Sequence, residues 1–88
     1  MKGTVHKLQS PDKSILVELD KNEIYPNDPG MGTPVMIYLR GGASGSWNCV
    51  ISEGEVEGHP LTRSQSAWLE SIAPTVWAWM QTHGVSAI

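Results

Sequence analysis

The chain has 88 residues, a formal net charge of −3 and a single cysteine, so it can build one hydrophobic core and no internal disulfide. We therefore expect one compact domain over residues 1–88, without a multi-cysteine zinc site. Its six basic side chains are scattered, which argues against nucleic-acid binding, and no apolar run approaches the roughly 20 residues that span a membrane, which favours a cytoplasmic protein.

A hairpin is the first predicted element. The segments TVHKLQ and SILVELD carry strand patterns, and they flank a turn in which Pro11 and Asp12 stand at favourable positions. Alternation in the second segment predicts that three side chains face the core, namely Ile15, Val17 and Leu19.

Residues 20–34 form a predicted loop, because DKNEIYPNDPGMGTP holds three prolines and two glycines. Residues 27–30 within it fit a type II turn. The acidic residues invite comparison with a calcium-binding EF-hand, but Ile24 and Tyr25 stand where that loop needs an oxygen ligand and a glycine. We expect a solvated loop and no metal ion.

The clearest predicted strand is PVMIYLR, followed by the glycine-rich stretch RGGASG and a second strand pattern, SWNCVIS. Two strand patterns around such a stretch predict another hairpin. Its expected core-facing residues are Val35, Ile37 and Leu39 in the first strand and Trp47, Cys49 and Ile51 in the second. At that place in a strand, Cys49 is expected to be a small core side chain rather than a nucleophile.

Two functional interpretations of the glycine-rich stretch fail on spacing. A phosphate-binding loop that started at Gly41 would need a second glycine and then a lysine, but Ser46 is followed by Trp47. A serine nucleophile on a strand-to-helix turn needs glycine on both sides of Ser44, two residues away, and the second glycine is missing. A hairpin turn is the interpretation that we adopt.

Glu53, Glu55 and Glu57 are spaced two apart after the predicted strand. If the strand continued, all three carboxylates would lie on its core-facing side, where burying their charge is costly. We therefore expect a break, bulge or turn at Gly54, or a strand end in solvent. The triplet could contact a basic partner or bind a metal with His59. We favour a solvated acidic edge that discourages aggregation.

A helix is predicted over residues 62–82, with Thr62 as N-cap, Gln65 completing a capping box and Gly84 as terminator. Pro74 predicts either a kink or two shorter helices, at about 63–72 and 75–82. The stripe expected to cover the sheet consists of Gln65, Leu69, Ile72, Val76, Trp79 and Met80, with Trp68 at its border and His83 near its end.

Trp77 falls outside that stripe, beside Ala73 and among small uncharged side chains such as Ala78. A tryptophan in such surroundings is typical of the centre of a protein interface. The alternatives are that Trp77 packs on a loop such as 20–34 or is singly exposed.

No catalytic constellation is recognisable. His6, His59 and His83 have no ligand spacing, and the sequence does not assign any pair of carboxylates to acid and base roles. His83 is expected to meet the last carbonyls of the helix. We expect no cofactor, no metal and no catalytic residue.

These elements predict an α+β fold, a four-stranded antiparallel meander of two hairpins with the C-terminal helix packed on one face. The second face would then expose apolar side chains, namely Leu16, Met36, Tyr38 and Val50. We expect a non-enzymatic interaction module that binds itself as a homodimer, or another protein. The expected interface is either the helix face of Trp77, with Ala73 and Ala78, or the second face of the sheet, with Met36 and Tyr38.

The alternative is a small-molecule binding domain or small enzyme, with a pocket between the sheet, the 20–34 loop and Trp47 or Trp68. Its expected ligand-binding residues are Tyr25, Tyr38, Arg40 and Asn48.

Overall fold

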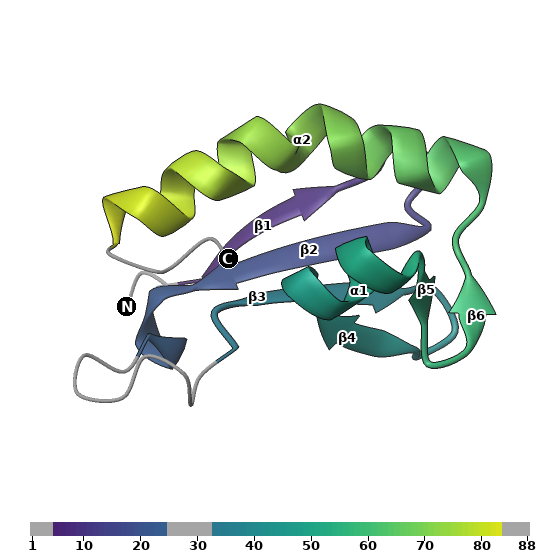
Figure 1. The fold of residues 1–88 in the computed structure, drawn as a ribbon, viewed down its shortest axis with the longest axis horizontal. Coiled ribbons are helices and arrows are strands. Elements are labelled where there is room, and N and C mark those ends of the chain that lie inside the picture. The colour runs from purple at the N-terminus through teal and green to yellow at the C-terminus, as the bar shows by residue number, and fades with distance from the viewer. Residues whose placement is uncertain (1–4, 25–32, 84–88) are drawn as a thin grey trace.

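The computed structural model describes residues 5–24 and 33–83 and shows the expected α+β fold (Figure 1). A four-stranded antiparallel sheet has the strand order β1-β2-β3-β4, and a second sheet pairs β5 with β6. In chain order the elements are β1 (Val5–Gln9), β2 (Ile15–Asp20), the 3-10 helix η1 (Lys21–Glu23), β3 (Val35–Leu39), β4 (Ser44–Ser46), α1 (Trp47–Glu53), β5 (Glu55–Val56), β6 (His59–Pro60) and α2 (Arg63–Thr82).

The first hairpin is confirmed, with Leu8 opposite Val17. Its turn is organised by Asp12, whose Oδ1 accepts hydrogen bonds from the Ser10 hydroxyl at 2.7 Å and from the amide and hydroxyl of Ser14. The type II turn expected at residues 27–30 lies outside the described residues.

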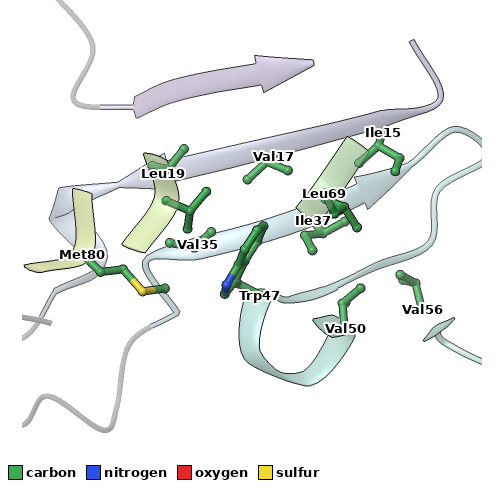
Figure 2. Close-up of a cluster of buried hydrophobic side chains, with 11 residues drawn as sticks. Ile15, Val17, Leu19, Val35, Ile37, Trp47, Val50, Val56, Leu69 and Met80 are labelled. Atoms are coloured by element: carbon green, nitrogen blue, oxygen red, sulfur yellow. The ribbon is translucent and has the colours of Figure 1, made fainter. Parts of the chain in front are cut away.

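Both helices pack on one face of the four-stranded sheet and enclose the core (Figure 2). Trp47 lies at its centre, between the strands and the two helices. The buried hydrophobic residues are Ile15, Val17, Leu19, Val35, Ile37, Trp47, Val50, Val56, Leu69, Val76 and Met80. The alternation predicted for β2 is therefore confirmed.

The strand predicted from SWNCVIS is wrong beyond Ser46, because the chain turns there into α1. Trp47 and Val50 are buried three residues apart, a helical spacing, whereas Cys49 and Ile51 are exposed. Val50 therefore lies in the core and not on the second face of the sheet. Gly45 permits this packing, since a Cβ there would lie 3.0 Å from Cγ2 of Val50.

The break expected at Gly54 is confirmed. Gly54 ends α1 with φ of 72°, and its amide donates to the Val50 carbonyl at 2.8 Å. The chain then forms the β5–β6 hairpin, which the sequence interpretation missed, with positive φ at Glu57 and Gly58. The three glutamates therefore lie on different elements and do not share one strand face.

Helix α2 begins as predicted, with a reciprocal capping box between Thr62 and Gln65. It continues through Pro74, so the single predicted helix is confirmed and the alternative of two shorter helices is wrong. His83 is exposed and caps the helix through its backbone amide, not through its imidazole, which instead lies 4.6 Å from the Trp79 ring. The expected terminator, Gly84, lies outside the described residues.

Candidate functional site

We call the side of the main sheet that lies opposite helices α1 and α2 the open face. Strand alternation and register assign its side chains, which are Val5, Lys7 and Gln9 from β1, Leu16, Glu18 and Asp20 from β2, Met36 and Tyr38 from β3, and Ser44 and Ser46 from β4. Those of β2, β3 and β4 are half-buried. No described helix packs over them, because α1 and α2 both contribute to the core on the other side.

Glu18 is the electrostatic centre of the open face. Its Oε2 lies 3.8 Å from the Nζ of Lys7, whose side chain is 60% exposed. Burial, followed by the charge of Glu18 and a hydrogen bond to it, raises the pKa of Tyr38. Tyr38 is therefore a neutral hydroxyl at physiological pH, held beside a carboxylate.

An open cleft of about 280 Å³ lies where this face meets the described ends of the 20–34 segment. Its position follows from local hydrogen bonds: the Asp20 amide donates to the Pro34 carbonyl at 2.8 Å, and the Asp20 carboxylate accepts from the Asn22 amide, starting η1. We name it the acidic cleft. Its lining residues are Glu18, Asp20, Glu23, Thr33, Pro34, Met36 and Tyr38.

The edges of the main sheet offer less to a partner than the open face does. At one edge, β1 carries Lys7 at its middle, and a charged side chain there discourages pairing with another strand. At the other edge, β4 has only three residues, Ser44–Ser46. A partner of the sheet is therefore better accommodated on its open face than at its edges.

The residues predicted as an interface lie on two different surfaces. Met36 and Tyr38 belong to the open face, whereas Ala73, Trp77 and Ala78 belong to α2, on the other side of the sheet. The sequence predicts a contact through one of these two surfaces, and which of them is used stays a prediction.

Helix geometry predicted that Trp77 would point away from the core, and this prediction is wrong. Trp77 is half-buried and makes an edge-to-face contact with Trp47, with ring centroids 5.8 Å apart and planes at 85°. Its contact with Trp47 therefore holds α2 against α1. Ala73 also packs on the core, while Ala78 is exposed.

The predicted ligand-binding residues are not brought together. Tyr38 lines the acidic cleft, Arg40 lines a separate cleft of about 580 Å³ beside Gly41 and Gly42, and Asn48 is exposed on α1. Tyr25 lies outside the described residues. Sequence reasoning missed Glu23 and the Thr33–Pro34 pair, because only folding brings both ends of the 20–34 segment to the sheet.

The two tryptophans expected beside a pocket also lie apart. Trp47 is 1% exposed and lines none of the described clefts, and its indole nitrogen has no hydrogen-bond partner among residues 5–24 and 33–83. Trp68 is half-buried and lines a cleft of about 270 Å³ against the β1–β2 turn, away from the open face.

Within residues 5–24 and 33–83, no group of three or more His, Cys, Asp or Glu side chains could hold a metal ion. The helices in these same ranges are too short or too polar to cross a bilayer. Comparison with models of protein families, with curated proteins and with solved structures found no match to the chain.

Proposed function

We propose that the protein is a small, non-enzymatic interaction module that binds another protein through its open face. The observation that carries this proposal is the asymmetry of β2 and β3. One side of these strands is covered by both helices, while Leu16, Met36 and Tyr38 on the other side stay half-buried with no described helix over them. A partner would remove this apolar surface from water.

The composition of the open face fits a protein interface. Leu16 lies opposite Tyr38, and Met36 lies opposite Glu18, so apolar and polar groups alternate at its centre. Around them lie the polar side chains of Lys7, Gln9, Ser44 and Ser46. A polar rim is usual for such contacts, and methionine and tyrosine are enriched in them.

A homodimer, which the sequence led us to expect, is a rival arrangement. Two copies joined through the open face would cover two acidic clefts, each lined by Glu18, Asp20 and Glu23, and at each cleft Lys7 forms an ion pair with Glu18. That contact would bury excess negative charge, which is costly without a counter-charge. We therefore favour a different protein as the partner on this face.

To test this proposal, peptides that bind the wild-type protein are selected from a displayed random-peptide library. The affinity of each selected peptide is then measured for two variants of the protein. Met36→Ser removes the central apolar side chain of the open face, and Ile51→Ser removes an exposed apolar side chain, 41% accessible, from α1. Binding is expected to weaken with Met36→Ser and to be unchanged with Ile51→Ser. Binders that are indifferent to Met36→Ser would contradict the proposal.

One observation favours a second candidate function, the binding of a small molecule. The acidic cleft lies between the sheet and the described ends of the 20–34 segment and contains Tyr38, one of the expected ligand-binding residues, whereas Trp47 and Trp68 lie elsewhere. A free ligand there would stabilise the protein against heat, and Tyr38→Phe would reduce that stabilisation. Thermal-shift screening of wild type and Tyr38→Phe distinguishes this function from peptide binding that depends on Met36.

A further inference from the structure

The negative charge of the open face gathers around the acidic cleft, where Glu18, Asp20 and Glu23 lie. The side chains that edge strand β4 contributes to the same face, Ser44 and Ser46, are uncharged. Lys7 is the cation paired with Glu18, and its long separation and high exposure make that pair weak. Glu18 and Glu23 can therefore still attract an incoming cation.

The walls of the acidic cleft suit the stem of a basic side chain. Pro34, Met36 and the ring of Tyr38 line it together with the carboxylates. Lysine and arginine pack their methylene groups on apolar surface while the charged end reaches polar groups. An arginine could also lie against the tyrosine ring. The same cleft thus offers apolar contact and counter-charge.

A metal ion and a nucleic acid fit this surface less well. The carboxylates of the acidic cleft are not arranged to hold a metal ion, since the described residues include no such group. A phosphate backbone would be repelled by the same carboxylates. A basic polypeptide segment satisfies both the charge and the apolar walls.

Resting on the proposed function, we propose that the segment bound by the open face is basic. A lysine or arginine of the partner enters the acidic cleft between Glu18 and Glu23, and the partner's neighbouring apolar residues pack on Met36 and Leu16. This assigns a class of partner, a polypeptide with alternating basic and apolar side chains, and a place for its charge.

The test uses two fluorescent synthetic peptides of the same length and leucine content. The charged positions carry lysine in one peptide and glutamate in the other. Fluorescence anisotropy is measured with the wild-type protein and with Glu23→Gln. The lysine peptide is expected to bind and the glutamate peptide is not. Glu23→Gln should weaken binding about two- to fivefold, the effect of one partly exposed charge pair.

Glu70→Gln is the matched control, because it removes one exposed carboxylate from α2 and changes the net charge equally. Its binding is expected to equal that of wild type. Equal weakening by Glu23→Gln and Glu70→Gln would overturn the inference, since it would indicate attraction by net charge alone. Equal binding of the two peptides would overturn it as well.

Met36→Ser separates failure of the inference from failure of the proposed function. Selected binders that need Met36 but are insensitive to Glu23→Gln would leave the open face as the interface and reject a basic partner. Binders insensitive to both variants would reject both statements. Light scattering measures the mass of the protein in solution. A dimer that Met36→Ser abolishes would identify a second copy as the occupant of the open face and overturn the inference.

Discussion

The two faces of β2 and β3 differ although they are made by alternating residues of the same strands. Val17 and Ile37 are fully buried beneath the helices, whereas Leu16, Met36 and Tyr38, one position away along the chain, are half-buried on the open face. One residue step thus separates side chains that hold the fold together from side chains that are available to a partner. Stability and binding should therefore respond to different substitutions within a single strand.

The largest expected effect comes from adjacent truncations in β3. Ile37→Ala should lower the free energy of unfolding by about 2–5 kcal/mol, since it leaves a cavity among the buried side chains that Figure 2 shows. Met36→Ala should cost about 1 kcal/mol or less, because its side chain is half-exposed. Urea unfolding of both variants checks this. Equal losses would show that the open face is part of the core.

A second contrast lies in β4. Gly45→Ala places a Cβ about 3.0 Å from the buried Val50 side chain, and we expect a loss of about 1–3 kcal/mol through overpacking. Ser44→Ala, on the open face of the same strand, should change stability by about 0.5 kcal/mol or less. Thermal unfolding measures both. A neutral Gly45→Ala would show that α1 does not pack closely on β4.

The smallest effect concerns Asp12, a carboxylate that serves the β1–β2 turn and not the open face. Hydrogen bonds from the amide of Ser14 and the hydroxyls of Ser10 and Ser14 lower the Asp12 pKa from 3.8 to about 2. A lowered pKa in the folded state stabilises the protein above pH 4, and this contribution is lost as the pH falls towards 2.

Asp12→Asn lacks this titration, so wild type and variant should converge in stability between pH 4 and pH 2. Unfolding curves at pH 6, 4 and 2 measure the difference. A difference that stays constant over this range would mean that the Asp12 carboxylate does not stabilise the turn through its charge.

The sequence was most informative where one local rule decides the structure. Alternation placed Val17 and Ile37 in the core, and the Thr62–Gln65 pair gave the correct start of α2. The sequence pattern misled at Trp47 and Val50, because WNCVIS is compatible with both strand and helix periods. The structure forms the helix, in which Trp47 and Val50 are both buried in the core.

The candidate site was predictable in part. Met36 and Tyr38 follow from strand alternation, so the sequence placed them correctly on the face opposite the core. The acidic cleft did not follow, because Glu23 and Thr33 are brought to β2 and β3 by the fold of a long connection. Trp77 was misplaced because a helical wheel does not show that Trp47 of another helix lies beside it.

The central claim is that partners bind on the open face, and nuclear magnetic resonance tests it most directly. Backbone and methionine methyl signals of the labelled protein would be followed during titration with the lysine peptide. The structure predicts that the largest shifts arise at Leu16, Glu18, Met36 and Tyr38. Largest shifts at Trp77 and Ala78, with the open face unchanged, would contradict it and place the interface on α2.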